Sequence, residues 1–428
     1  MTTLILFGSF VIFLILRLPI GISLGLSSLV TILTSDTVSA TYVAQGLVTA
    51  ADSFPLMAVP FFVLAGELMG KGGISKRLLA FADAFLGKKT GGLALITVVT
   101  CMFFAAISGS GPATVAAIGG LTIPAMVEQG YDKKFASAIA AAAGAIGVII
   151  PPSIPMVMYG VSTGASVSSL FVGGIFPGIL IGVSLLLYSH FYCKKHGYIN
   201  KNAPDFTWGN AGRAFWDAKW ALLVPVIILG GIYGGIFTPT EAAAVAVAYG
   251  LIAGCFIYKD LKWKDLWDIF SGAALTTATI MIILGTATTF GRILTIEHIP
   301  TQIASFFISI SNSRIIIMLL INFLLLVVGC FMETNAAIII LAPIFLPIVS
   351  ALGVDTVAFG IIMVVNLAIG FVTPPLGVNL FVACNVASCK LEEISKGILP
   401  IIGVMVLDLM IITYWEPITM FLPHVLVG

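Results

Sequence analysis

Long apolar stretches, separated by short polar connections, make up most of this 428-residue chain. A helix needs about 20 apolar residues to cross a bilayer, and many of these stretches are that long. They predict an all-α polytopic membrane protein, with crossing helices over residues 4–34, 54–70, 174–192, 221–236, 239–258, 268–291 and 398–422. Residues 75–89 differ because their apolar positions share one helical face, which predicts an amphipathic helix on the cytoplasmic membrane surface.

Two further apolar segments, 135–165 and 356–388, are each interrupted by two adjacent prolines, within Gly147–Ser153 and Gly370–Leu376. Proline lacks a backbone donor and disfavours the helical conformation in the residue before it, so a membrane helix must break at each site. Carbonyls freed at bilayer depth are tolerated only where protein or a water-filled cavity covers them, and there they can coordinate a cation.

The two breaks belong to a repeat that runs through the chain at a constant offset of 223 residues. The matched pairs are Pro124 with Pro347, Gly130 with Gly353, Asp132 with Asp355, Pro151 with Pro374, Pro152 with Pro375, and Pro177 with Pro400. Many of these are Gly or Pro, which set backbone shape. The sequence therefore predicts one structural unit present twice, as repeat 1 over 1–192 and repeat 2 over 221–428. Trp208, Trp216 and Trp220 mark an interfacial, cytoplasmic linker over 193–220.

The basic residues indicate that the two copies are inverted in the membrane. Five Lys and Arg residues lie between Gly70 and Thr90, whereas the equivalent stretch 294–312 has none. Because Lys and Arg favour the cytoplasmic side, equivalent loops should lie on opposite sides. By the same rule, 91–127 enters and leaves on one side as a re-entrant hairpin that breaks at Ser108–Pro112. A second hairpin over 314–349 enters from outside and turns at Glu333–Asn335.

Composition narrows the function classes. Hydrophobic residues make up 59% and charged residues 9% of the chain, and the mean hydropathy is +1.14. The formal net charge of +1 leaves no basic face for a nucleic acid. The six cysteines show no C-x-x-C spacing and the four histidines no H-x-x-x-H spacing, so neither type indicates a metal site or a disulfide.

The hairpin tips are the first candidates for chemistry. Ser108–Pro112 combines exposed carbonyls with hydroxyls, and Glu333–Asn335 is polar as well. Each tip should face its own broken helix, and oxygen ligands with little formal charge suit a monovalent cation. Small residues also serve helix packing, which is the plainer explanation of one such patch.

Ionisable residues at membrane depth are costly, which singles out Arg292 and Glu333. If both line a cavity, the Arg292 guanidinium would bind a substrate carboxylate and Glu333 would bind donors of the same molecule. Arg292 could instead extend to the outer interface. Glu241 belongs to a predicted capping box, Thr238–Glu241, and so has a structural role. Glu67, Asp408 and Glu416 are interpreted as solvated residues near helix ends.

Two other functions deserve comparison with transport. Gly109-Ser110-Gly111 resembles the nucleophile setting of an intramembrane serine protease, but all four histidines lie in predicted loops or helix ends, away from this serine. A channel is a stronger rival. Re-entrant hairpins in an inverted duplicate fit alternating access better, so we expect a transporter and no enzyme.

The motifs Ser108–Thr114, Gly147–Ser153, Gly329–Asn335 and Gly370–Leu376 together resemble the large membrane subunit of tripartite ATP-independent periplasmic (TRAP) transporters, the DctM-like family. The resemblance covers the whole chain. It implies a bacterial inner-membrane protein, and the predicted crossings with the positive-inside rule give a cytoplasmic N-terminus and a periplasmic C-terminus. It also implies a small membrane subunit and a periplasmic substrate-binding protein as partners, and sodium as the coupling ion with no other cofactor. In the implied elevator motion, a transport domain of both hairpins and both broken helices slides against a scaffold.

The same resemblance implies two sodium sites. The first would use Ser108, Ser110, Gly147, Ile150 and Pro152, and the second Gly329, Thr334, Gly370, Thr373 and Pro375. The offset independently relates three pairs, 147 to 370, 150 to 373 and 152 to 375. The tips break the symmetry, because Ser110 corresponds to Glu333.

The predicted substrate-binding set is Ser153, Arg292, Glu333 and Asn335. One arginine beside one glutamate suits a single carboxylate together with hydroxyl or amide donors, because Glu333 would repel a second carboxylate. We therefore expect a sialic-acid-type sugar acid, with a C4-dicarboxylate as the alternative.

Overall fold

The computed structural model describes residues 2–35, 41–199, 206–311 and 313–427. Over these ranges the chain is helical and forms no β-strand. Eight of the helices described there are long and apolar enough to cross a membrane. The all-α membrane class predicted from the apolar pattern is confirmed.

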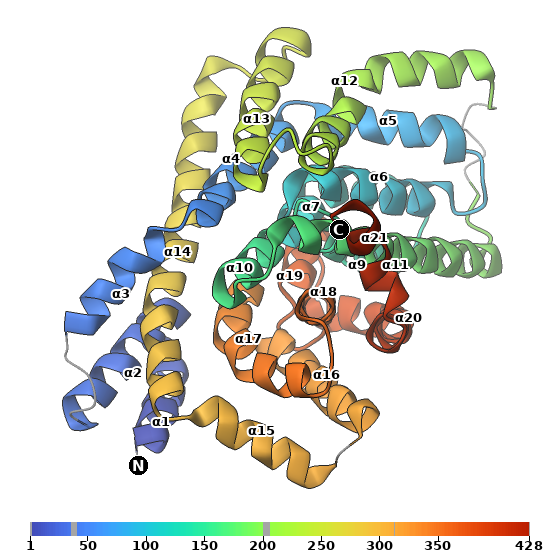
Figure 1. The fold of residues 1–428 in the computed structure, drawn as a ribbon. Coiled ribbons are helices and arrows are strands. Elements are labelled where there is room, and N and C mark those ends of the chain that lie inside the picture. Colours follow the sequence, from blue (N-terminus) through green and yellow to red (C-terminus); the bar gives the residue numbers. More distant parts are fainter. Residues whose placement is uncertain (1, 36–40, 200–205, 312, 428) are drawn as a thin grey trace.

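One set of helices, called here the lateral group, lies mainly along one side of the molecule (Figure 1). Its members are α1 (Thr2–Ile15), α2 (Ile20–Ser35), α3 (Thr41–Ala51), α4 (Ala58–Lys71), α5 (Ile74–Leu86), α12 (Trp208–Tyr233), α13 (Pro239–Leu251), α14 (Trp263–Ile296) and α15 (Ile299–Ile310). A 3-10 turn (Phe54–Met57) precedes α4, and a π-helical turn (Ile252–Ile257) continues α13. In Figure 1, α5 and α12 extend along one edge of the remaining helices and α15 along the opposite edge.

The remaining helices form the hairpin group. From repeat 1 it contains α6 (Gly92–Ser108), α7 (Gly111–Thr114), a π-helical turn (Val115–Gly119), α8 (Gly120–Glu128), α9 (Lys133–Ala145), a 3-10 turn (Ile146–Val148), α10 (Ile154–Thr163) and α11 (Val167–His196). From repeat 2 it contains α16 (Arg314–Phe331), α17 (Thr334–Ala351), α18 (Thr356–Gly370), α19 (Val378–Ala387), α20 (Leu391–Tyr414) and α21 (Pro417–Leu426). Helices α9 and α18 are almost wholly buried, so the two broken helices run through the centre of this group.

Both proline pairs break their helices as predicted. The first broken helix stops after Val148 and resumes at Ile154, and the second stops at Gly370 and resumes at Val378. Both Pro–Pro peptide bonds are cis. The first residues of the two broken helices are capped in the same way. Asp132 accepts a hydrogen bond from the Lys134 amide at 2.9 Å, and its equivalent Asp355 accepts one from the Val357 amide at 2.7 Å. These N-caps satisfy backbone donors that lack a partner within the helix.

Packing between the copies is reciprocal. Helix α10 packs on α17, and its equivalent α19 packs on α7 and α8, which are the equivalent of α17. In the lateral group α4 packs on α13, while its equivalent, the second part of α14, packs on α2. Each copy therefore contributes the second half of its broken helix to the hairpin of the other, as a two-fold relation between the repeats requires, while α9 and α18 also pack on the hairpin of their own copy.

The structure differs from the predicted helices in several places. Residues 4–34 are two helices, because Pro19 interrupts the first apolar stretch and Arg17 takes a positive φ of 63° in the turn. The predicted linker 193–220 becomes helical from Trp208, residues 200–205 lying outside the described ranges. The stretch 398–422 breaks before Pro417 into α20 and α21. Helices α3 and α15 were not predicted, although α15 is the repeat-2 equivalent of the amphipathic helix α5.

Candidate functional site

A cavity of about 600 Å³ lies where the two hairpin tips face the lateral group. Tip 2 contributes Glu333 and Asn335, and tip 1 contributes Ser108, Gly109, Ser110, Pro112 and Ala113. The cavity is also lined by the start of α10 at Ile154, by Val378 at the start of α19, by Glu67 of α4, and by Thr276 and Thr279 of α14. Residues more than 200 positions apart in the sequence thus line the same cavity.

Tip 1 gathers hydroxyl and carbonyl oxygens. Ser108 Oγ lies 2.9 Å from Thr114 Oγ1, and Thr114 Oγ1 donates to the Ser110 carbonyl at 2.7 Å. Gly147 lies against the same oxygens, because a Cβ placed on it would stand 2.5 Å from Thr114 Oγ1 and 2.7 Å from the Ser110 carbonyl oxygen. The structure therefore brings together Ser108, Ser110 and Gly147 of predicted site 1, and adds Thr114.

The other two residues of predicted site 1 lie at the break itself. A Cβ placed on Gly109 would stand 3.0 Å from the Pro152 carbonyl oxygen, so this carbonyl faces tip 1. Ile150 packs its side chain on Gly178 of α11, and its amide donates to the Ile146 carbonyl at 3.0 Å. Pro152 and Ile150 are both buried, which encloses this site within the protein.

Predicted site 2 is built on a close approach of two backbones. A Cβ on Gly370 would stand 2.5 Å from three backbone atoms of Gly329, so α16 and α18 touch at two glycines. Thr334 is buried, and Thr373 Oγ1 donates to the Ile369 carbonyl at 2.7 Å. Pro375 is exposed, in contrast to its buried equivalent Pro152. The two predicted sites thus differ in the contacts of their equivalent glycines, Gly147 and Gly370, and in how far they are enclosed.

The unlike tip residues Ser110 and Glu333 have the same local role. Ser110 Oγ accepts from the Ala113 amide at 3.4 Å, and the Glu333 carboxylate accepts from the Ala336 amide at 3.0 Å. Each residue is the N-cap of the second arm of its hairpin. The repeat therefore preserves the cap while the residue type, and with it the charge, differs between the copies.

Two of the four residues predicted to bind substrate line this cavity. Glu333 and Asn335 do so, and Asn335 Nδ2 donates to Glu333 Oε1 at 2.7 Å. The buried Asn335 Oδ1 has no hydrogen-bond partner within the described part of the chain, which leaves it able to accept from a bound molecule.

Ser153 and Arg292 lie elsewhere. Ser153 is buried as the N-cap of α10, where Oγ donates to the Val148 carbonyl at 2.5 Å and accepts from the Met156 amide at 3.3 Å. Arg292 is exposed on α14, nine residues beyond the cavity residue Ile283, which is about 14 Å along a helix. Neither side chain is part of the cavity lining in this conformation.

Two acidic residues were misjudged from the sequence. Glu67, interpreted as solvated, lines the cavity from α4. Asp408, interpreted in the same way, is 4% exposed in the interior of α20 and accepts from Ser184 Oγ of α11 at 2.8 Å. The apolar residues on either side of each acid could have indicated its position. An acidic residue in the middle of an apolar membrane helix is costly unless it has a partner or faces a cavity.

Helix starts supply the positive potential of the cavity. Helices α7, α10, α17 and α19 all begin at its lining, and helix N-termini carry partial positive charge. None of the described residues that line the cavity is Lys, Arg or His. An anion bound here would therefore be held by backbone N–H groups and small polar side chains.

Comparison with protein families decides what kind of protein contains this cavity. Residues 7–418 match the family described as "Tripartite ATP-independent periplasmic transporter, DctM component". The chain belongs to this family. A DctM component is a transporter permease subunit, so the transporter prediction is confirmed and the protease alternative is excluded.

Similar DctM-type proteins differ in the substrates that their names give. The chain is 57% identical to the isethionate TRAP transporter permease protein DctMQ of Oleidesulfovibrio alaskensis, over 97% of this chain and 66% of that protein. It is 42% identical to the C4-dicarboxylate large permease protein DctM of Vibrio cholerae, over 97% and 96% of the two chains. It is 36% identical to the sialic acid large permease protein SiaM of the same organism, over 96% of each.

A solved structure shares the fold. The Alcanivorax borkumensis YdaH transporter, described as having an unusual topology, aligns with a TM-score of 0.59 over 88% of each chain at 16% identity. Similarity at this level supports the helical arrangement alone.

Proposed function

We propose that this chain is the membrane permease of a sodium-coupled importer of small organic anions in the bacterial inner membrane. The observation that carries the proposal is the convergence of both hairpin tips, and of four helix starts, on one cavity. Helix N-termini attract the anion, while the neutral oxygens of tip 1 suit a sodium ion. Within the described ranges no group of three His, Cys, Asp or Glu side chains offers a divalent-metal site.

The proposed movement is an elevator. The hairpin group would carry the cavity across the membrane against the lateral group, which would act as the scaffold. The two groups meet closely at tip 1, where a Cβ on Gly66 of α4 would stand 3.3 Å from the Ser108 Cα and carbonyl oxygen. A small residue on the scaffold side permits such an approach and lets one surface slide over the other.

Isethionate, a small hydroxy-sulfonate, replaces sialic acid as the first substrate candidate. The isethionate relative is 57% identical to this chain, and the sialic acid relative is 36% identical. A C4-dicarboxylate remains the alternative substrate, because the C4-dicarboxylate permease of Vibrio cholerae is 42% identical to this chain. A singly charged anion also suits a cavity that contains Glu67 and Glu333, because two carboxylates there disfavour a second negative charge on the ligand.

The proposed partners are a small membrane subunit and a periplasmic substrate-binding protein. The chain accounts for 66% of the length of the DctMQ relative, which leaves about one third of that protein for a second component. The C-terminus is proposed to be periplasmic. The cytoplasmic N-terminus expected from a single crossing over 4–34 is not proposed again, because α1 and α2 are two helices that pack on each other.

Uptake into proteoliposomes tests the function directly. Vesicles would contain the chain with its small subunit, and uptake of radiolabelled isethionate, succinate and sialic acid would be measured with and without a sodium gradient and the binding protein. We expect isethionate uptake that requires both sodium and the binding protein. Passive flux of all three acids without the binding protein would instead establish a channel.

The sodium site at tip 1 has a separate test. Removing one oxygen ligand by Ser108→Ala or Thr114→Val should raise the sodium concentration for half-maximal uptake about tenfold, which corresponds to about 1.4 kcal/mol. Thr373→Ala should act similarly at site 2. Thr97→Val is the matched control, because Thr97 on α6 is buried and, among the described residues, its hydroxyl bonds only the Leu93 carbonyl of its own helix. Unchanged sodium dependence in the three site variants would contradict the assignment.

A further inference from the structure

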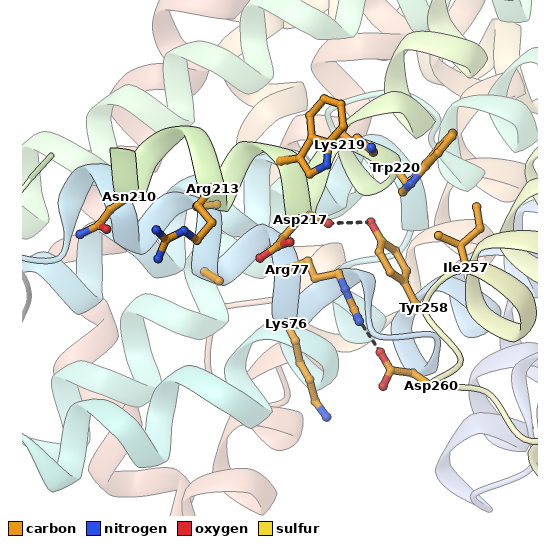
Figure 2. Close-up of a pocket in the computed structure, with 13 residues that line it drawn as sticks. Lys76, Arg77, Asn210, Arg213, Asp217, Lys219, Trp220, Ile257, Tyr258 and Asp260 are labelled. Atoms are coloured by element: carbon orange, nitrogen blue, oxygen red, sulfur yellow. Dashed lines mark hydrogen bonds and ion pairs between the residues drawn. The ribbon is translucent and has the colours of Figure 1, made fainter. Parts of the chain in front are cut away.

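A second cavity, of about 810 Å³, lies outside the hairpin group, between α5, the first part of α12 and the end of the π-helical turn that follows α13 (Figure 2). Its lining is basic and aromatic. Lys76 and Arg77 come from α5, and Arg213 and Lys219 from α12; among the described lining residues only Asp217 and Asp260 oppose these four positive charges. The described lining therefore has a net charge of +2, although the whole chain is close to neutral.

Two of the four cations are fixed in the cavity wall. Arg77 bonds the Asp260 carboxylate at 2.5 Å, and its guanidinium lies 3.7 Å from the centre of the Tyr258 ring. Tyr258 in turn donates to the Asp217 carbonyl at 3.2 Å, as Figure 2 shows. Lys219 Nζ lies 3.4 Å from the Trp216 ring centroid. These contacts join α5, α12 and the segment after α13, so the cavity has a defined shape.

The other two cations are available to a ligand. Lys76 and Arg213 are exposed, and neither makes an ion pair within the described part of the chain. They stand on different helices, α5 and α12 (Figure 2). An anion between these helices could therefore be contacted from both sides.

The cavity lies at the level of a membrane boundary. The apolar part of α12 begins at Trp220, and the apolar segment that starts with α13 ends at Ile257; both residues line the cavity. Exposed Trp216 and Trp220 line the cavity, and further exposed tryptophans lie at the starts of α12 (Trp208) and α14 (Trp263 and Trp267). Tryptophan favours the headgroup region of a bilayer, and basic side chains beside it attract anionic lipid.

We propose that this cavity binds the phosphate of an anionic phospholipid from the adjacent leaflet. Lys76 and Arg213 would contact the phosphate, with Lys219 and Arg77 providing the surrounding positive potential. The acyl chains would extend past exposed Phe215 and Trp216, into the space beside the apolar part of α12. The lipid would thereby connect amphipathic α5 to α12 within the lateral group.

Native mass spectrometry tests this proposal on the complex with the small subunit. Phosphatidylglycerol and phosphatidylcholine would be titrated separately, and bound lipid counted at each concentration. We expect retention of phosphatidylglycerol in preference to phosphatidylcholine, and about tenfold weaker phosphatidylglycerol binding by the Lys76→Gln/Arg213→Gln double variant. The Lys194→Gln/Lys195→Gln double variant loses the same charge from exposed positions on α11 and should bind like the original protein.

The outcomes separate the possible sources of phosphate. Inorganic phosphate, added in place of lipid, should not displace phosphatidylglycerol at equal concentration; displacement would show a site for a free anion and overturn the lipid proposal. Equal retention of the two lipids, or an unaltered affinity in the Lys76→Gln/Arg213→Gln variant with an unaltered unfolding temperature, would also overturn it.

Discussion

Replacing Gly147 by alanine should reduce sodium-driven uptake at least tenfold. The added methyl group would stand 2.5 Å from Thr114 Oγ1 and 2.7 Å from the Ser110 carbonyl oxygen, which are closer than ordinary contacts. Either the oxygens or the broken helix must move, and overpacking of this kind typically costs about 1–3 kcal/mol. Because the displaced oxygens are the proposed sodium ligands, the half-saturating sodium concentration should rise as well.

Gly403→Ala is the matched control for this prediction. Gly403 is an exposed helical glycine on α20, and a Cβ there would meet no atom within 4 Å. The unfolding temperature with and without sodium separates loss of the ion from loss of the fold, since an ion that binds the folded state raises the unfolding temperature. We expect the sodium-induced rise to vanish in Gly147→Ala and to persist in Gly403→Ala. A full sodium-induced rise in Gly147→Ala would contradict this account of site 1.

The repeat explains why so much of the hairpin group was predictable. Proline and glycine act through the backbone itself, so their recurrence at offset 223 fixes where helices break whatever side chains surround them. The breaks at Pro151 and Pro374 and the turns after Ser108 and before Thr334 all lie within the predicted intervals. Asp132 and Asp355 show that equivalent caps persist as well.

The lateral group was less predictable because apolar windows do not show where a helix turns back on itself. Pro19 divides the first stretch into α1 and α2, which pack on each other, although hydropathy is continuous across it. The lysines around α5 indicate a segment at the cytoplasmic surface. Helix α15 has no lysines, so the pattern of basic residues does not indicate it. The offset of 223 could have predicted α15, because it relates this segment to α5.

The site shows the same division between backbone and side chain. The contact of Gly147 with tip 1 agrees with the prediction that each tip faces its own broken helix, whereas Gly329 was grouped with Gly370 only by the family resemblance. The roles of Thr114, Glu67 and Arg292 depend on how helices from distant parts of the chain are rotated about their axes. The sequence of a helix that is apolar on all sides does not specify that rotation, which only packing against neighbours determines.

Charge is the main difference between the two tips, and it offers a basis for substrate selection. Ser110 and Glu333 cap equivalent helices, so a neutral residue would satisfy the cap at tip 2 as it does at tip 1. The carboxylate at tip 2 therefore requires a further explanation. Repulsion of doubly charged anions supplies one, because Glu333 and Glu67 face the same cavity.

Glu333→Gln should therefore relax selectivity while preserving the fold. The glutamine oxygen can still accept from the Ala336 amide, and its NH2 group can donate to Asn335 Oδ1 once that amide turns over, so the unfolding temperature should stay close to that of the original protein. Competition by succinate against isethionate uptake should become about tenfold more effective, equivalent to about 1.4 kcal/mol. Glu333→Ala, in contrast, removes the cap and should lower the free energy of unfolding by about 1 kcal/mol.

Asp355→Asn is the control that separates selectivity from a general effect of charge. Asp355 is also a helix N-cap, it is exposed, and it lies outside the cavity lining. Its replacement removes the same charge from the start of α18 and should leave competition by succinate unchanged. If succinate competes equally well with the original protein and with Glu333→Gln, the carboxylate does not select by charge. Its presence at tip 2 would then reflect hydrogen bonding to Asn335 and Ala336 alone.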